Sequence, residues 1–373
     1  MKTQAAILRK PGSAWEIAEL ELDPPKDGEV LVRFVAAGLC HSDEHIRAGE
    51  APIRMPLVGG HEGAGIVEDV GPGVTRVAPG DHIVCSFVPI CGMCYYCASG
   101  RQGLCEAAKY VAVGCLNDET FRFHAGGEDF GGMCMLGTFA RFAVVTEWSC
   151  VKIDPEVPLE LAALLGCGVP TGWGSAVRAA GVRVGDTAVI FGVGGVGINA
   201  VQGAHLAGAR HVVAVDPVEF KREKALELGA THAAPDAATA LDLVAELTGG
   251  RLADQAIVTV GALTAQVINE AVGIIGKGGV VMLTSVGNFA EMRMDMSPGP
   301  LIGPQRTLKG ALMGGVNPLS DIPRLVGLYR SGQLKLGELI TRRYRLDQIN
   351  DGFQDMLDGK NIRGLLVHEH EGD

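Results

Sequence analysis

Hydrophobic residues follow one pattern in the first 150 residues and another in the residues that come after. Near the N-terminus, β-branched runs end at Gly or Pro, which is typical of short strands bounded by turns. Examples are EVLVRFVAAGLC (29–40), GAGIVEDVGPGV (63–74) and DHIVCSFVPICG (81–92). Helical periodicity is scarce here, so the sequence predicts a mainly-β first domain.

From about Gly185, apolar runs alternate with helical patterns. The pattern predicts strands at 186–193, 211–216, 253–261 and 278–287, and helices at 194–209, 217–230 and 265–275. Strands that alternate with helices in this way form a doubly wound parallel sheet with helices on both faces. We therefore expect an α/β protein whose second domain has the Rossmann fold.

The C-terminal part contains two helical stretches, 322–331 and 346–358, and a final strand, RGLLVHEH (363–370). We expect this tail to return to the first domain. The expected division is residues 1–169 with 313–373 in one domain and 170–312 in the other. A chain of 373 residues has room for two domains of about 100–200 residues each.

Composition narrows the possible partners and the compartment. The formal net charge is −11 and no Lys/Arg-rich tract is present, so a nucleic-acid partner is not expected. The N-terminus has no signal-peptide pattern, and no apolar run reaches the roughly 18 residues of a membrane helix. We expect a cytoplasmic protein without a membrane segment. Its ten cysteines then stay reduced, and clustered ones are more typical of metal ligands than of disulfides.

A glycine-rich loop follows the first strand of the second domain. Gly192, Gly194 and Gly197 form the order G-x-G-x-x-G between that strand and a helix, and Gly195 and Val196 complete the loop. The first glycine allows a tight turn, the second lets a pyrophosphate approach, and the third lets helix and strand pack closely. Because the helix N-terminus attracts phosphates, the loop predicts a dinucleotide site. A glycine-rich turn without a ligand is the alternative.

Asp216 ends the next strand, nineteen residues after Gly197. A carboxylate at this place accepts hydrogen bonds from the adenosine ribose and repels a 2′-phosphate. The sequence therefore favours NAD(H) over NADP(H).

Two sets of metal-binding residues are present. Four cysteines of one loop can close a tetrahedral zinc site, which makes that site structural; they are Cys91, Cys94, Cys97 and Cys105. Cys40, His61 and Cys167 can bind a second zinc and leave its fourth position open, as catalytic sites do. Taken alone, Cys167 reads as core filler and His61 as a structural histidine. It is their joint presence that favours a metal site.

These motifs resemble the zinc-dependent alcohol dehydrogenases of the medium-chain dehydrogenase/reductase superfamily. The likeness runs from GLCHSDEH (38–45) to KNIRGLLV (360–367), through GHEGAGIVEDVG, the four-cysteine lobe, GCGVPTGWGSA and GVGGVG. The resemblance implies a GroES-like, mainly-β catalytic domain joined to a Rossmann domain. It also implies two zinc ions per chain and NAD.

The resemblance assigns roles to individual residues near the second metal site. Asp43 would orient the His61 imidazole, and Glu62 would be the neighbouring carboxylate that approaches the metal during ligand exchange. Ser42 would hydrogen-bond the alcohol, and His45 would be the distal base of a proton relay.

Four further residues are assigned by resemblance alone. His41 and Arg363 would lie near the coenzyme pyrophosphate, and Lys221 near the adenosine ribose. Phe87 would form a wall of the substrate pocket.

The expected function is the reversible transfer of a hydride between an alcohol and NAD, which yields an aldehyde or ketone. A thiol-dependent formaldehyde dehydrogenase and a nicotinoprotein, which keeps its NAD bound and uses an external acceptor, are alternatives. A structural protein that binds NAD and zinc without catalysis is a remote alternative. The resemblance implies a homodimer, with a tetramer possible, assembled through the segments 278–287 and 309–316.

Overall fold

The computed structural model describes residues 1–285, 287–288 and 293–370. The described residues form two compact units. The first unit contains Met1–Cys167 and the chain from Asn317 onward, and the second contains Gly168–Val316. The C-terminal tail therefore belongs to the same unit as the N-terminus.

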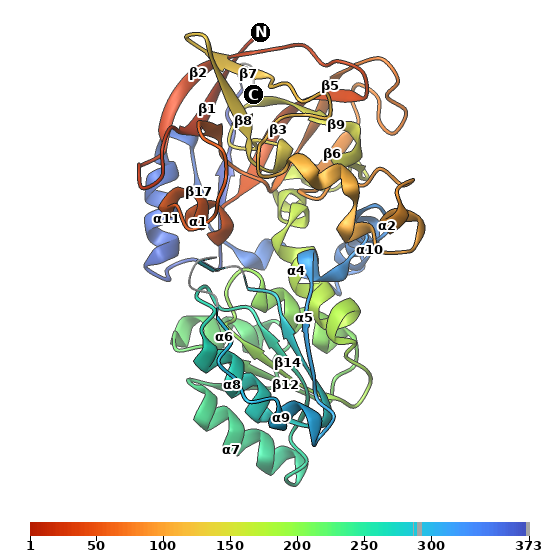
Figure 1. Ribbon diagram of the computed structural model, residues 1–373, viewed down its shortest axis with the longest axis vertical. Helices are drawn as coiled ribbons and strands as arrows, with labels where there is room; N and C mark the ends of the chain where they lie inside the picture. Colours follow the sequence, from red (N-terminus) through yellow and green to blue (C-terminus); the bar gives the residue numbers. More distant parts are fainter. Residues whose placement is uncertain (286, 289–292, 371–373) are drawn as a thin grey trace. The chain divides into compact units, whose positions relative to one another are not determined.

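A closed barrel and an open sheet build the first unit (Figure 1). The barrel has the order β1-β2-β7-β8-β4, with β1 at Lys2–Leu8, β2 at Glu16–Leu22, β7 at Phe123–Ala125, β8 at Glu128–Gly132 and β4 at Leu57–Val58. The sheet has the order β10-β6-β5-β3-β18-β17, and β9 also pairs with β3. Its strands are Cys150–Lys152 (β10), His82–Cys85 (β6), Gly63–Val70 (β5), Glu29–Gly38 (β3), Arg363–Val367 (β18), Ile340–Tyr344 (β17) and Phe142–Thr146 (β9).

Helices cover parts of this unit, and aromatic residues pack the last one against the N-terminal segment. Trp15 stacks on Phe353 and meets the edge of Phe139, with ring centroids 5.4 Å apart in both pairs. The Asn350 side chain accepts a hydrogen bond from the Trp15 backbone N–H and donates one to its carbonyl. The helices are α1 (His41–Ala48), α2 (Tyr95–Ala98), α3 (Leu159–Ala162), α10 (Pro318–Arg330) and α11 (Ile349–Leu357).

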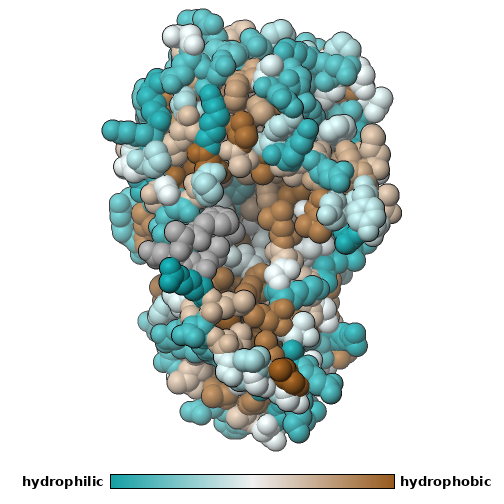
Figure 2. Space-filling view, viewed as in Figure 1, coloured by the Kyte–Doolittle hydropathy of each residue, from teal (hydrophilic) through white to brown (hydrophobic). Residues whose placement is uncertain are grey.

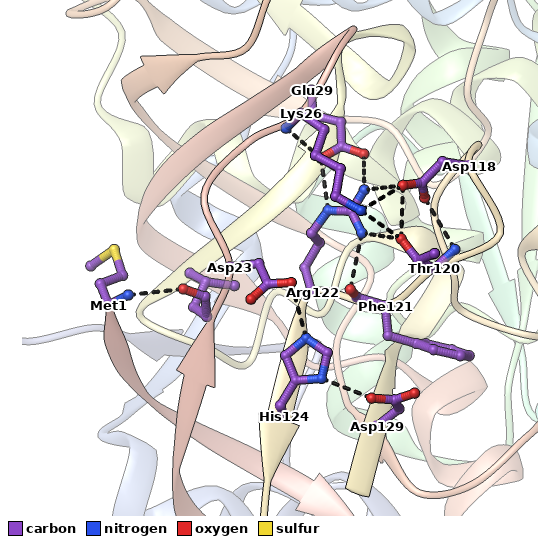
Figure 3. A network of polar contacts seen from close by, with 11 residues as sticks. Met1, Asp23, Lys26, Glu29, Asp118, Thr120, Phe121, Arg122, His124 and Asp129 are labelled. Carbon is purple, nitrogen blue, oxygen red and sulfur yellow. Dashed lines mark hydrogen bonds and ion pairs between the residues drawn. The ribbon is translucent and has the colours of Figure 1, made fainter. Parts of the chain in front are cut away.

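A buried ion pair joins the loop that precedes β7 to the first residue of β3 (Figure 3). The Arg122 guanidinium, with a side chain only 1% exposed, donates to both carboxylate oxygens of Glu29 and to Asp118. Lys26 also pairs with Asp118. Because a buried charge without its partner costs several kcal/mol, about 3–5, this network fixes the loop tightly.

The second unit is a parallel sheet in the order β13-β12-β11-β14-β15-β16. The sequence predicts such a doubly wound sheet, and the structure confirms it. All five residues of β11 are buried, as expected for a central strand covered on both faces. The strands are His232–Ala234 (β13), His211–Val215 (β12), Thr187–Phe191 (β11), Ala253–Val258 (β14), Ile275–Leu283 (β15) and Thr307–Gly310 (β16). The helices are α4 (Gly168–Gly174), α5 (Gly197–Leu206), α6 (Glu219–Glu227), α7 (Ala237–Thr248), α8 (Ala265–Ile274) and α9 (Gly299–Ile302).

The two segments expected to assemble a dimer differ in part from the expectation. The segment 278–287 reaches beyond β15, which ends at Leu283, and its Val286 lies outside the described residues. In the segment 309–316, only the first two residues, up to Gly310, belong to strand β16. Met313 and Gly314 then have φ of 50° and 63°, a left-handed conformation that ends an extended segment.

Hydrophilic side chains cover most of the first unit on the face that Figure 2 shows. Among the described residues, no helix combines the length and apolar character needed to cross a membrane.

His368, just after β18, gives the first unit a pH-dependent stability. Burial lowers the pKa of its imidazole to about 4, and its Nε2–H donates to the Thr138 carbonyl at 2.9 Å. The unfolded state takes up a proton near pH 6.5 and the folded state does not, so stability falls as the pH falls. Between pH 7.5 and 5.5 we expect a loss of about 1.3 kcal/mol from this residue. Urea unfolding should show a smaller loss in His368→Gln, which keeps the donor; equal losses would contradict the assignment.

Candidate active site

The four-cysteine lobe brings its sulfur atoms to the spacing of a zinc site. Cys105 Sγ lies 3.5 Å from Cys91 Sγ and 3.9 Å from Cys94 Sγ, and Cys91 Sγ lies 4.0 Å from Cys97 Sγ. Four sulfurs about 2.3 Å from a central zinc would lie about 3.8 Å apart. The Cys94 backbone N–H donates to Cys91 Sγ at 3.3 Å, which favours a thiolate.

The pKa values of two thiols in this lobe are shifted in opposite directions. Backbone N–H groups of Glu106 and Cys97 lower the pKa of Cys94 to about 6, whereas burial raises the pKa of Cys97 to about 12. A bound Zn²⁺ supplies the charge that holds all four as thiolates. The donor set and its spacing therefore fit a zinc with no open position.

A second cluster lies in the first unit and is fully buried. One ligand atom from each of Cys40, His61, Glu62 and Cys167 lies within 4.8 Å of the other three. Cys40 caps the N-terminus of α1, His61 and Glu62 precede β5, and Cys167 follows a short 3₁₀ turn. The sequence motifs that carry these residues are far apart in the chain, and the sheet brings them together.

Electrostatics at this cluster also favour a metal cation. The hydrogen bond from Cys167 holds the pKa of the Cys40 thiol well below its usual range, and the hydrogen bond and charge of His61 act in the same direction. The hydrogen bond to Cys40 and burial raise the pKa of the Cys167 thiol well above the usual range of a thiol. The two sulfurs thus share one negative charge, and a divalent cation is what would let both act as thiolates. The residues fit a zinc bound by two sulfurs and an imidazole.

Asp43 joins the helix cap to the imidazole. Its Oδ2 accepts the Cys40 backbone N–H and its Oδ1 lies 3.1 Å from His61 Nδ1. The His61 Nδ1–H therefore points to the carboxylate, and Nε2 is left for a metal, the usual arrangement behind a zinc-bound histidine. Because Asp43 is 0% exposed, water does not compete for it.

Glu62 pairs with Arg363, which lies 301 residues further along the chain. Burial raises the pKa of Glu62 to about 7, although the Arg363 guanidinium opposes the shift. The pair occupies space beside Gly38, where a Cβ would lie 2.2 Å from Glu62 Oε2. Glu62 Oε1 has no hydrogen-bond partner among the described residues. Arg363 therefore holds one carboxylate oxygen and leaves the other available to the metal cluster.

Of the other predicted residues of the first unit, Ser42 and Phe87 lie beside residues of the metal cluster, whereas His41 and His45 lie along α1. Ser42 Oγ is 3.7 Å from Cys40 Sγ, and the Phe87 ring meets His61 edge-on at 5.7 Å between centroids. His41, the first residue of α1, is exposed. His45 lies one turn further along α1 and contacts Glu50, a residue that the sequence analysis did not single out.

The glycine loop adopts the tight turn that the sequence predicts. Gly192 has φ +80°, and a Cβ on Gly197 would lie 1.8 Å from the Gly192 carbonyl oxygen. A Cβ on Gly194 would have no atom of the described residues within 4 Å, so among them the loop is open at that glycine. Gly195 and Val196 lead into α5, whose first N–H groups suit a phosphate. The loop thus fits a dinucleotide.

Asp216 lies directly after β12 and next to the loop. Its Oδ2 accepts the Val193 N–H at 3.0 Å and its Oδ1 accepts the Val218 N–H at 2.9 Å. A carboxylate has about four acceptor positions, so ribose hydroxyls can still bind. Arg222, which the sequence analysis missed, donates to the Asp216 carbonyl at 2.8 Å, and Lys221 is partly exposed nearby in α6.

Comparisons with known proteins decide the family. Residues 26–155 match the alcohol dehydrogenase GroES-like domain, and residues 195–330 match the zinc-binding dehydrogenase family. The chain is 56% identical over 368 residues to an NDMA-dependent alcohol dehydrogenase from Amycolatopsis methanolica, covering 99% of both chains. It belongs to the zinc-dependent alcohol dehydrogenases of the medium-chain dehydrogenase/reductase superfamily.

Other relatives agree with this assignment. The dehydrogenase is 46% identical to alcohol dehydrogenase B of Mycobacterium tuberculosis, covering 98% of both chains. Benzyl alcohol dehydrogenase from Acinetobacter calcoaceticus is 29% identical with a TM-score of 0.91, over 99% of this chain and 100% of the other. A zinc-binding domain protein from Burkholderia ambifaria is 34% identical with a TM-score of 0.93, over 99% and 100%.

Family membership confirms the predicted reaction class. The chain is an enzyme, an oxidoreductase that acts on a small-molecule alcohol with zinc and a nicotinamide dinucleotide. The expected GroES-like domain is confirmed as well. The roles of individual site residues stay predictions.

Zinc content tests the two clusters separately. We expect two zinc ions per chain in the dehydrogenase as purified and one in Cys40→Ser. Cys94→Ser should lose the other zinc and unfold at a lower temperature, because a structural zinc contributes folding energy. Cys115→Ser, a buried cysteine outside both clusters, is the control and should keep two. Two zinc ions in Cys40→Ser, measured by atomic emission, would contradict the assignment.

Two alanine variants separate packing from coenzyme binding in the glycine loop. Gly197→Ala places its Cβ against Gly192 and should destabilise the protein by about 1–3 kcal/mol. Gly194→Ala adds a Cβ that contacts no described residue, so the NAD-free variant should keep the Tm of the NAD-free wild type while it binds NAD more weakly. Thermal unfolding and nucleotide titration measure the two effects. Undiminished NAD binding by Gly194→Ala would show that the dinucleotide does not approach this glycine.

Proposed function

We propose that this dehydrogenase oxidises an alcohol to an aldehyde or ketone with an NAD that stays bound and is reoxidised by an external acceptor. The observation that carries the proposal is 56% identity, over nearly the whole chain, to an enzyme named for its dependence on NDMA. The open loop at Gly194 and the carboxylate of Asp216 support NAD as the bound nucleotide.

The protein places groups around the reacting alcohol. When bound, zinc would supply a Lewis acid that makes the alcohol hydroxyl more acidic, and NAD would supply the hydride acceptor. Asp43 holds the His61 imidazole through Nδ1, so that Nε2 is the nitrogen that would bind the metal, and Arg363 holds Glu62 beside the cluster. Ser42 and His45 are proposed to accept and pass on the proton of the alcohol.

Four further residues are proposed to contact the substrate or the coenzyme. Phe87, edge-on to His61, is proposed as an apolar wall that excludes water from the reacting carbon. Lys221 is proposed to contact the adenosine ribose, and His41 and Arg363 the pyrophosphate. For Arg363, such contact would add to its ion pair with Glu62.

We further propose a cytoplasmic homodimer. All ten cysteines lie within the described residues and none forms a disulfide, which supports a reducing compartment. In the described part of the second unit β16 is an edge strand, and its unpaired backbone groups can join the same strand of a second copy. An assembled chain would measure about twice the monomer mass of 39.0 kDa in light scattering.

Nucleotide retention tests the proposed function. Protein purified without added nucleotide should release about one NAD per chain on acid denaturation, since retention implies slow dissociation. It should oxidise primary or secondary alcohols with NDMA as acceptor and no added NAD. Turnover that requires free NAD would contradict retention, and activity only with formaldehyde plus a thiol would identify the alternative enzyme. NADP in the released nucleotide would contradict the role of Asp216.

A further inference from the structure

His45 and Glu50 form a hydrogen-bonded pair at the end of α1. His45 Nδ1 lies 2.5 Å from Glu50 Oε2, and the two side chains are 12% and 33% exposed. The pair is built locally: α1 ends at Gly49, whose φ of 81° turns the chain back. The Glu50 backbone N–H then donates to the His45 carbonyl at 2.8 Å, which places the carboxylate beside the imidazole.

The other ring nitrogen of His45 makes no hydrogen bond to any described residue. Its Nε2 is buried and has no hydrogen-bond partner within the part of the chain that the structure describes. A carboxylate can only accept a hydrogen bond, so the shared hydrogen belongs to Nδ1. The neutral imidazole therefore presents the lone pair of Nε2, which is what a proton acceptor requires.

The remaining charged groups of α1 are engaged elsewhere. Asp43 binds the Cys40 N–H and His61, and the Arg47 guanidinium donates to both carboxylate oxygens of Glu44. Arg47 also donates to the Ser13 carbonyl of the neighbouring segment. Glu50 is thus the carboxylate whose hydrogen bond fixes the ring of His45.

We propose that Glu50 is a positioning residue for the proton relay: it fixes His45 in the tautomer with hydrogen on Nδ1 and stabilises the imidazolium that forms when Nε2 takes up a proton. This inference rests on the proposed role of His45. The alcohol O–H bond breaks as its proton passes to Ser42 Oγ, the Ser42 O–H proton forms the Nε2–H bond, and Nε2 later releases that proton to solvent. The same carboxylate–imidazole arrangement orients His61 through Asp43.

A double-mutant cycle tests the inference in the zinc-loaded, NAD-containing enzyme. Glu50→Gln should lower kcat for alcohol oxidation about tenfold with little change in KM, and His45→Gln about a hundredfold. The double variant should be no slower than His45→Gln, because Glu50 acts only through the imidazole. Glu44→Gln alters the same helix at the Arg47 pair and should keep the wild-type kcat. Multiplicative losses in the double variant would overturn the inference.

A second readout does not depend on activity. The ¹⁵N and ¹H spectrum of the His45 ring, identified by its absence in His45→Gln, should show hydrogen on Nδ1 in the wild type and a shifted tautomer balance in Glu50→Gln. Hydrogen on Nε2 in the wild type would overturn the inference. If the wild type oxidises no alcohol but shows the expected ring spectrum, the proposed function fails while the positioning by Glu50 stands.

Discussion

Four ionisable side chains, Cys40, His61, Glu62 and Cys167, share one buried site, and the arrangement around them depends on how their charges are balanced. Charges removed from water are costly unless they are paired or bind a metal. The pKa of the Cys40 thiol is lowered and that of the Cys167 thiol is raised, so the two sulfurs share one negative charge. A divalent cation would allow both to be thiolates. The surrounding residues are placed to support that cation.

The fold supplies this support from distant parts of the chain. Strand β18 pairs antiparallel with β3, with Leu365 opposite Gly38, and this pairing brings Arg363 to Glu62. A side chain at position 38 would collide with the pair, so glycine is needed there. The C-terminal tail therefore contributes to the site even though none of its residues is a proposed metal ligand.

Carboxylates behind imidazoles recur in α1 and its surroundings. Asp43 directs the ring of His61, and Glu50 directs the ring of His45. In both cases a carboxylate holds Nδ1, so Nε2 is the nitrogen that would take part in the chemistry. The first arrangement suits a metal ligand, and the second suits a group that moves a proton. One short helix thus positions both.

Local motifs in the sequence predicted much of the site, because each motif carries its own geometry. The four cysteines and the glycine loop lie in short stretches whose spacing dictates their shape, and the parallel sheet follows from the alternation of strands and helices. The Glu62–Arg363 pair and the Glu50 contact involve geometry that spacing does not encode. The end of β16 was missed because left-handed residues such as Met313 have no clear sequence signal. The resemblance to a family named Arg363 and Glu62 separately but did not predict the ion pair between them.

X-ray absorption at the zinc edge tests the central claim most directly. The account predicts an average of about three sulfur ligands per zinc, because one zinc has four and the other two. It also predicts that an alcohol-site inhibitor changes the nitrogen and oxygen shell without changing the number of sulfurs. An average of four sulfurs, or a shell that no inhibitor alters, would contradict a zinc that is open to substrate at Cys40, His61 and Cys167.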